Sequence, residues 1–197
     1  MNSTISNPSD EVPPSTSRLS QQAQSCLDRL KSILLEMQHV LVAFSGGVDS
    51  ALVLAVAHSV LEEKAIAITA ISPTFPPEEQ EIATHFTAER AIEHILLETH
   101  ELEDEGYAKN DGRRCYFCKS ELFSLAQKRA QTLNIPWLLD GTIVDDLGDY
   151  RPGLDAASEN EVRHPLVEAG FNKVLVREVA KHLGIHVWNK PSFACLG

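Results

Sequence analysis

Apolar positions along the chain fall into blocks whose period switches between that of a helix and that of a strand. Over 19–37, large apolar side chains recur every three or four residues, which predicts an amphipathic helix. A short continuous apolar run with β-branched residues follows at 39–44 and predicts a strand buried on both faces of a sheet. Two glycines end that run, and the pattern then predicts a helix over 49–61.

The alternation continues through the rest of the sequence. The pattern predicts strands at 65–71, 93–99 and 136–142, and helices at 76–91, 119–133 and from the cap Asn172 to the residue before Gly184. Strands that alternate with helices predict an α/β fold with an open parallel sheet and flanking helices. The domain is expected to span 19–197, because residues 1–18 hold almost no large apolar side chain and are predicted to be a disordered tail.

The acidic composition narrows the classes of partner. The chain has 28 Asp and Glu against 17 Lys and Arg, a formal net charge of −11, which opposes general binding to nucleic acid or to an anionic membrane surface. No apolar stretch approaches the roughly 20 residues needed to cross a bilayer, and the N-terminus lacks the apolar core of a secretory signal. The four cysteines are too few for a disulfide scaffold in 197 residues. We therefore expect a cytoplasmic protein with a small-molecule partner.

The segment SGGVDS joins the first core strand to a helix and has the features of a phosphate-binding loop. Its glycines let the backbone approach an anion closely, and the amides that begin the helix add donors and the positive end of the helix dipole. Asp49 could hold the Mg²⁺ that accompanies a nucleoside triphosphate. The candidate ATP-binding residues in this loop are Ser45, Gly46, Gly47, Val48, Asp49 and Ser50. The alternative is a plain Gly-Gly turn capped by Ser45 or Asp49.

More polar residues follow the strand predicted at 136–142. Carboxylates there could coordinate Mg²⁺ or bond a ribose hydroxyl, small residues could let the backbone approach adenine, and an arginine could pair with a phosphate or carboxylate. The carboxylate candidates are Asp145, Asp146 and Asp149, the small residues are Gly141 and Thr142, and the arginine is Arg151. The alternative for each is a solvated loop or a helix cap. Asp140, at the strand end, could equally have a structural or a functional role. Histidines such as His94 are expected at the surface or as core residues whose ring nitrogens are hydrogen-bonded.

Three of the cysteines form a second candidate centre. Cys115 and Cys118 make a CxxC pair, expected on a small loop ahead of the helix at 119–133, and this spacing suits a soft metal or an iron–sulfur cluster. Basic neighbours would favour the thiolate form. With Cys195 as a third ligand, a 4Fe-4S cluster would keep one iron without a protein ligand. The alternatives are packed thiols or a redox pair for CxxC and buried packing for Cys195, and Cys26 is assigned to packing.

SGGVDS resembles the pyrophosphate loop of the N-type ATP pyrophosphatases, the PP-loop enzymes that include NAD, GMP and asparagine synthetases. The resemblance implies the adenine nucleotide alpha hydrolase-like fold, with an open parallel sheet and flanking helices. It also implies cleavage of ATP between its α and β phosphates, with transfer of AMP to an oxygen of the substrate. It does not name the acceptor of the AMP group.

A narrower resemblance comes from longer strings. RRCYFCKSELF, LDGTIVDDLGDYRPGLDAA, VRHPLVEAGFNKVLVREVAKHLGI and NKPSFACL resemble, in order and spacing, the ATP-dependent sacrificial sulfur transferases of the LarE family. That family acts in biosynthesis of the nickel-pincer nucleotide cofactor. The resemblance implies adenylylation of a carboxylate of a pyridinium mononucleotide, followed by replacement of AMP by sulfur to give a thiocarboxylate.

The LarE family has two branches that differ in the source of sulfur. In the single-cysteine branch the sulfur comes from the enzyme's own cysteine, matched here by Cys195, which is left as dehydroalanine. In the three-cysteine branch the matching residues Cys115, Cys118 and Cys195 bind a 4Fe-4S cluster, and a sulfide on its open iron is transferred. The CxxC pair makes this chain resemble the cluster branch. The cofactors implied are therefore ATP, Mg²⁺ and a 4Fe-4S cluster.

The sequence departs from the family at its C-terminus. The family's C-terminal region, with basic residues for the substrate phosphate and much of the subunit contact, has no counterpart before Gly197. We therefore expect weakened binding of the nucleotide substrate and a weakened homo-oligomer. The competing functions are an amide-forming ligase similar to NAD or GMP synthetase, an inactive nucleotide- or cluster-binding remnant, and a tRNA thiolase, which the net charge disfavours.

Overall fold

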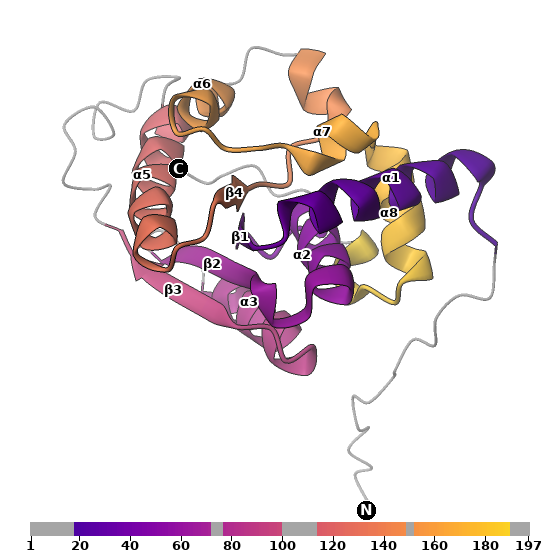
Figure 1. The fold of residues 1–197 in the computed structure, drawn as a ribbon, viewed down its shortest axis with the longest axis horizontal. Coiled ribbons are helices and arrows are strands. Elements are labelled where there is room, and N and C mark those ends of the chain that lie inside the picture. Colours follow the sequence, from indigo (N-terminus) through magenta and orange to yellow (C-terminus); the bar gives the residue numbers. More distant parts are fainter. Residues whose placement is uncertain (1–17, 72–76, 100–113, 149–151, 190–197) are drawn as a thin grey trace, which may run out of the picture.

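The computed structural model describes residues 18–71, 77–99, 114–148 and 152–189. Its centre is a four-stranded parallel sheet in the order β3-β2-β1-β4 (Figure 1). The strands are β1 (Val40–Ala43), β2 (Ala65–Ile71), β3 (His94–Glu98) and β4 (Trp137–Leu139). The chain adds β2 and β3 on one side of β1 and then β4 on its other side, so the strand order reverses between β1 and β4.

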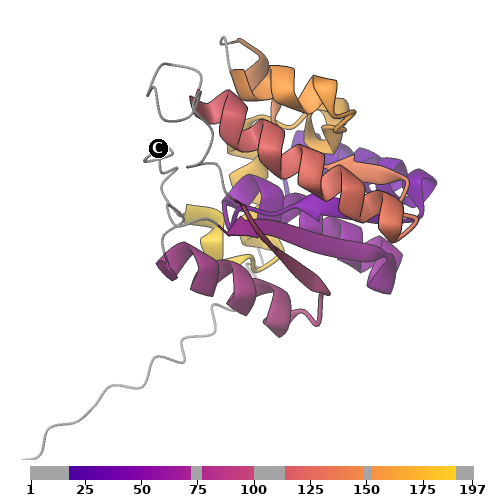
Figure 2. The same ribbon diagram turned by 90° about the vertical axis from the view of Figure 1, so that its left-hand side faces the viewer.

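Helices cover both faces of this sheet, as Figure 2 shows with α5 and α6 on one side of the strands and α3 on the other. The α-helices are α1 (Gln21–Met37), α2 (Val48–Leu61), α3 (Pro77–Glu89), α5 (Arg114–Thr132), α6 (Pro152–Glu159), α7 (Pro165–Ala169) and α8 (Lys173–His182). Short 3-10 helices are η1 (Glu62–Lys64), η3 (Val144–Gly148) and η4 (His186–Asn189). The predicted α/β architecture is confirmed.

Two apolar clusters hold the layers together, and β1 contributes to both. Val40 and Val42 pack into the cluster that includes α1, α2, α3, α7 and α8, whereas Leu41 and Ala43 pack into the cluster beneath α5 and α6. All four of these residues are buried. This explains the continuous apolar run at β1, because a central parallel strand buries alternate side chains on opposite faces.

The predicted strands and most helices lie within a few residues of the observed ones, with three differences. The helix expected from 119 begins at Arg114, so the CxxC pair lies within α5 and its expected position on a preceding loop is wrong. The strand expected over 136–142 ends at Leu139, because Asp140 to Ile143 turn to meet the loop after β1. Helices α6 and α7 were not predicted, because they are too short to show a helical period.

Helix α8 begins where the sequence predicts. The Oδ1 of Asn172 accepts a hydrogen bond from the Leu175 amide at 2.9 Å, which is an N-cap. None of the helices in the described ranges is long and apolar enough to span a lipid bilayer.

Candidate functional site

The SGGVDS loop lies at the carboxyl end of β1 and leads directly into α2. Gly46 adopts a φ of 74°, a left-handed conformation that favours glycine, and Gly47 is the N-cap of α2 without a side-chain cap. The Oγ of Ser50 donates to the Gly47 carbonyl at 3.2 Å and accepts from the Ser45 amide at 3.3 Å, which holds the loop in this shape. The first turn of α2 therefore presents amides that no side chain caps, the geometry of an anion site.

The turn after β4 packs directly on this loop. A Cβ built on Gly141 would lie 2.5 Å from the Ser50 amide nitrogen and 2.9 Å from the Asp49 carbonyl carbon, so only glycine fits. The turn and the loop meet where the strand order reverses, which is where open α/β sheets bind ligands. Gly141 thus sets the distance between the two sides of the candidate site, and its predicted approach to adenine stays a prediction.

Asp49 is engaged by a lysine from a distant part of the chain. The Nζ of Lys173 donates to both carboxylate oxygens of Asp49, at 2.9 and 2.7 Å, and both side chains are about one quarter exposed. Burial raises the pKa of the Asp49 carboxyl, Lys173 opposes that rise by its hydrogen bond and charge, and the nearby Asp146 carboxylate adds to it. The two carboxylate oxygens of Asp49 therefore bind a cationic group, and the role of Asp49 in holding Mg²⁺ stays a prediction.

The predicted acidic residues that the structure describes lie in η3 beside this pair. The Oδ2 of Asp146 accepts from the Ile143 amide at 3.0 Å, and the Oδ2 of Asp145 accepts from the Lys173 amide at 2.7 Å. Both carboxylates therefore accept hydrogen bonds from backbone amides, which fits a structural role. Asp146 nevertheless contributes negative charge at Asp49, so the two lie in one electrostatic environment.

Thr142 and Asp140 also bond to each other. The Thr142 amide donates to Oδ1 of Asp140 at 3.0 Å, and its Oγ1 donates to Oδ2 at 2.8 Å. Asp140 is only 6% exposed. The proton of the Thr142 hydroxyl is thus committed to the turn, and the predicted contact of Thr142 with a nucleotide stays a prediction.

The structure places the CxxC pair at the start of α5. Positions 115 and 118 are one helical turn apart, a spacing compatible with ligands to one centre, and the Cys118 thiol is half-buried. Within the described ranges no group of three His, Cys, Asp or Glu side chains could hold a metal ion. Cys195, Arg151 and Asp149 lie outside the described residues, so the predicted cluster ligand set stays a prediction.

Two residues that border the SGGVDS loop, called the phosphate loop from here on, were not among the predicted site residues. One is Lys173, and the signal was available: a lysine in the first turn of a helix is unfavourable next to the positive end of the dipole unless an anion lies nearby. The other is Glu79 of α3, whose carbonyl oxygen and Oε2 lie 3.6 and 3.7 Å from a Cβ built on Gly46. An acidic residue in a first turn is ordinary, so nothing in the sequence set Glu79 apart.

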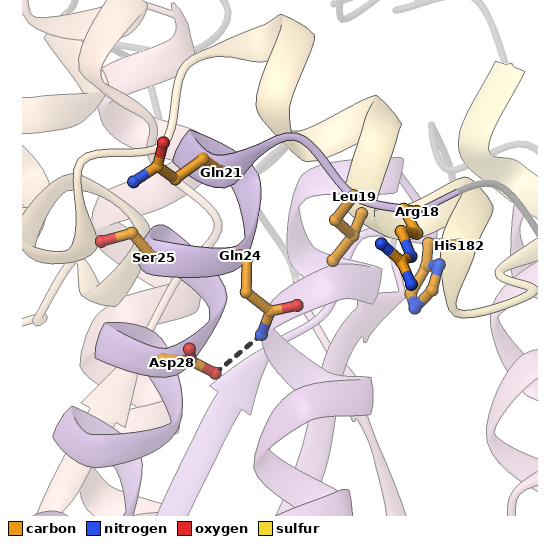
Figure 3. Close-up of a pocket in the computed structure, with 7 residues that line it drawn as sticks. All are labelled: Arg18, Leu19, Gln21, Gln24, Ser25, Asp28 and His182. Carbon is orange, nitrogen blue, oxygen red and sulfur yellow. Dashed lines mark hydrogen bonds between the residues drawn. The ribbon is translucent and has the colours of Figure 1, made fainter.

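A separate hollow lies on the outer side of α1 near the end of α8 (Figure 3). It is lined by Arg18, Leu19, Gln21, Gln24, Ser25, Asp28 and His182. None of the predicted site residues contributes to it. Gln24 Nε2 donates to Asp28 Oδ1 at 2.9 Å across this surface, and no feature of the hollow indicates a ligand.

Curated relatives support the sequence resemblance. The chain is 38% identical over 162 residues to the pyridinium-3,5-bisthiocarboxylic acid mononucleotide synthase of Lactiplantibacillus plantarum, covering 82% of this chain and 59% of that protein. An uncharacterised protein of Synechocystis is 44% identical over 173 residues, and one of Methanocaldococcus jannaschii is 27% identical over 180. These matches cover 88% and 86% of this chain and 65% of each relative. The chain thus spans about three fifths to two thirds of the length of these relatives. No family model matches the sequence.

Comparison with solved structures shows the fold. The NH3-dependent NAD synthetase of Campylobacter jejuni matches with a TM-score of 0.65 at 19% identity, covering 90% of this chain and 80% of that one. The NMN synthetase of Francisella tularensis matches with a TM-score of 0.64 at 16% identity, covering 89% and 76%. The fold is that of the adenine nucleotide alpha hydrolases. At these identities the likeness shows the fold and leaves the reaction open.

Proposed function

We propose that this protein is an ATP-dependent sulfurtransferase that adenylylates a carboxylate of a pyridinium mononucleotide and then replaces AMP by sulfur. The observation that carries the proposal is the 38% identity to a pyridinium bisthiocarboxylic acid mononucleotide synthase, which extends over 82% of this chain. The uncapped phosphate loop supports it, because adenylylation needs a site for the phosphates of ATP.

In the first step, a substrate carboxylate oxygen attacks the α-phosphorus of ATP, and the bond from that phosphorus to the bridging oxygen breaks. Pyrophosphate carries away the electron pair, and the developing negative charge falls on its oxygens. The amides of the first turn of α2 would hold these oxygens, and Asp49 would hold Mg²⁺ beside them. This charge stabilisation is the main contribution that the loop makes to the rate.

Lys173 has two states in this scheme. In the structure its ammonium neutralises Asp49, and the arrival of Mg²⁺ at that carboxylate would displace it. The displaced ammonium lies within reach of the same loop and would pair with a phosphate oxygen. Lys173 therefore keeps the half-buried carboxylate compensated until Mg-ATP arrives and then contributes positive charge to the leaving pyrophosphate.

In the second step, sulfur forms a bond to the adenylylated carbonyl carbon, the bond from that carbon to the AMP oxygen breaks, and AMP leaves. Cys195 is the proposed sulfur donor or cluster ligand, with Cys115 and Cys118 as the other ligands. As the donor, Cys195 would attack through Sγ, and its Cβ–Sγ bond would then break with loss of the Cα proton, so that the thiocarboxylate leaves and position 195 becomes dehydroalanine. A bound 4Fe-4S cluster would supply a sulfide on its open iron. The start of α5 is compatible with this, since positions 115 and 118 share one helical turn.

The proposal is tested by incubating the protein without oxygen with Mg-ATP and a pyridinium carboxylate mononucleotide. Release of AMP and pyrophosphate together with a thiocarboxylate product supports it. Use of ATP without sulfur incorporation contradicts the sulfur-transfer half, and failure to bind Mg-ATP contradicts the site itself.

The NAD synthetase fold favours a second candidate, an amide-forming ligase in which ammonia attacks the adenylate. Both reactions share the first step and differ in the atom that displaces AMP. Adding ammonium in place of a sulfur source separates them, because only the ligase would incorporate nitrogen. The cysteines of the CxxC pair have no role in the amide reaction, which makes it the weaker candidate.

A further inference from the structure

A hydrogen-bonded pair of side chains with a buried carboxylate lies on the β4 side of the phosphate loop. The Nδ1 of His164, the residue that precedes α7, is 2.7 Å from Oδ1 of Asp140. The Asp140 side chain is 8% exposed and that of His164 is 23% exposed. Burial opposes ionisation of Asp140, but the hydrogen bonds from His164 and Thr142 outweigh it and hold the pKa of this carboxyl below its ordinary value. An ionised carboxylate only accepts, so Nδ1 of His164 carries the proton and donates it.

The Asp140 carboxylate accepts further hydrogen bonds, and these shape the turn that follows it. Its two oxygens accept from the amide and the hydroxyl of Thr142, which fixes the backbone from 140 to 142. Gly141, at the centre of that turn, is the residue whose backbone lies against the Ser50 amide. Ser50 in turn holds the loop through Ser45 and Gly47. A continuous chain of contacts therefore runs from His164 to the phosphate loop.

The segment that carries His164 also contacts β4 directly, since the Arg163 guanidinium lies 5.0 Å from the centroid of the Trp137 ring and Val162 packs in the same apolar cluster as Leu138. Arg163 forms a single bridge to Leu139, in which the Arg163 amide donates to Leu138 and the Arg163 carbonyl accepts from Asp140. This bridge holds the backbone amide of Asp140, whereas the Asp140 carboxylate, which shapes the turn at Gly141, is not part of it. Among the described residues, the His164 side chain is therefore the polar contact that ties this segment to the Asp140 carboxylate.

We propose that His164 is a positioning residue for the phosphate loop, acting through Asp140 to hold the turn at Gly141 against the first turn of α2. The inference rests on the proposed ATP site for its ligand. The contact of His164 depends on one atom of its ring, Nδ1, because the other ring nitrogen has no hydrogen-bond partner in the described part of the chain. In this role His164 keeps the backbone amides that would bind the phosphates at the carboxyl ends of β1 and β4.

Three substitutions at one position separate this role from general packing. His164→Asn keeps a donor near the place of Nδ1, His164→Gln moves the donor to the place of Nε2, and His164→Leu removes it. We expect the Leu and Gln variants to bind Mg-ATP roughly tenfold more weakly by calorimetry, in the range of coupling through packed networks, whereas the Asn variant retains most of the affinity. Thr142→Val, which removes only the hydroxyl partner, should weaken binding less than His164→Leu.

A second measurement needs no nucleotide. Amide hydrogen exchange at residues 48–51 should be faster in His164→Leu than in His164→Asn, because the turn no longer buttresses the first turn of α2. Equal exchange and equal Mg-ATP affinity in folded His164→Leu and wild-type protein would overturn the inference. A wild-type protein that does not bind Mg-ATP would instead refute the proposed function, and the exchange comparison would still decide the role of His164. If His164→Leu does not fold, the Gln and Asn variants provide the same comparison.

Discussion

Lys173 and Asp49 are 124 positions apart in the sequence, yet the lysine ammonium bonds both oxygens of that carboxylate. The pair joins the first turn of α8 to the first turn of α2, beside the phosphate loop. Neither position is favourable alone, because burial opposes the carboxylate and the helix dipole opposes the lysine. Each charge therefore compensates the other, and a bound ligand that carries charges would replace this pairing.

Replacing Lys173 by Met should reduce pyrophosphate release from ATP by about a hundredfold, the usual cost of removing one group that stabilises transition-state charge. The effect should fall mainly on turnover, since the lysine contributes most once Mg²⁺ occupies Asp49. A steady-state comparison with Lys128→Met, at an exposed position of α5, checks this. Equal turnover in both variants would remove Lys173 from the site.

Replacing Asp49 by Asn should weaken Mg²⁺-dependent use of ATP by at least about tenfold, because a neutral amide is a poor ligand for this cation. Stability should change by no more than about 1 kcal/mol, since the pair with Lys173 is partly exposed. Magnesium titrations of ATP turnover with a thermal melt measure both effects. Unchanged magnesium dependence would assign the cation to another carboxylate.

Replacing Gly141 by Ala should destabilise the protein by about 1–3 kcal/mol, because the added methyl group meets the Ser50 amide at 2.5 Å. The turn would have to move away from the loop, so ATP binding should weaken as well. Gly148→Ala is the matched control, since a Cβ there has no atom within 4 Å and should change stability by less than about 0.5 kcal/mol. Chemical denaturation of the two variants compares them directly.

His94 should make the protein sensitive to acid. Its ring nitrogens lie 2.8 Å from Thr69 Oγ1 and 3.1 Å from Thr87 Oγ1, and burial lowers the pKa of His94. The unfolded chain then binds a proton at a pH where the folded protein does not. The free energy of unfolding should therefore fall as the pH drops below about 6.5, the ordinary histidine value, and continue to fall down to the lower folded pKa.

His94→Gln tests this source of acid sensitivity, because the variant has no imidazole to titrate at that position. Its unfolding free energy should depend less on pH than that of the wild type over this window. His85→Gln, whose side chain is 75% exposed on α3, is the matched control. A wild-type slope that persists in His94→Gln would place the acid sensitivity elsewhere.

Replacing Cys115 or Cys195 by Ser should abolish iron binding and leave ATP binding intact. Protein purified without oxygen should otherwise hold about four irons per chain, the number in a 4Fe-4S cluster. Iron and acid-labile sulfide assays on each variant measure this, and iron retained by a variant would remove that cysteine from the ligand set. An iron-free wild type that still binds ATP would leave Cys195 as a sacrificial donor, to be checked by its loss of mass after turnover.

The sequence was most informative where one physical signal dominates. Strand β1 could be predicted because burial on both faces demands a continuous apolar run, and the loop after it because glycines and a helix start occur together. The cap Asn172 was found for the same reason, since its side chain satisfies a backbone amide nearby in sequence. These features depend on neighbours within a few residues.

Contacts between distant segments could not be predicted in this way. Nothing near Lys173 names Asp49 as its partner, and nothing near His164 names Asp140, because the partners are 124 and 24 positions apart in the sequence and meet only in the folded protein. The role of Gly141 is of the same kind, since its need for glycine comes from the Ser50 backbone. The start of α5 was misplaced because the CxxC motif suggested a loop, whereas its spacing also fits one helical turn.

The most direct measurement is the mass of the product formed from a pyridinium carboxylate mononucleotide with Mg-ATP, in the absence of oxygen. A carboxylate adenylylated on this phosphate loop and then attacked by sulfur gives a product in which one oxygen is replaced by sulfur, with one AMP and one pyrophosphate released for each exchange. That product would support the proposed function. A product with nitrogen in place of oxygen, or ATP bound by the loop without any AMP being formed, would contradict it.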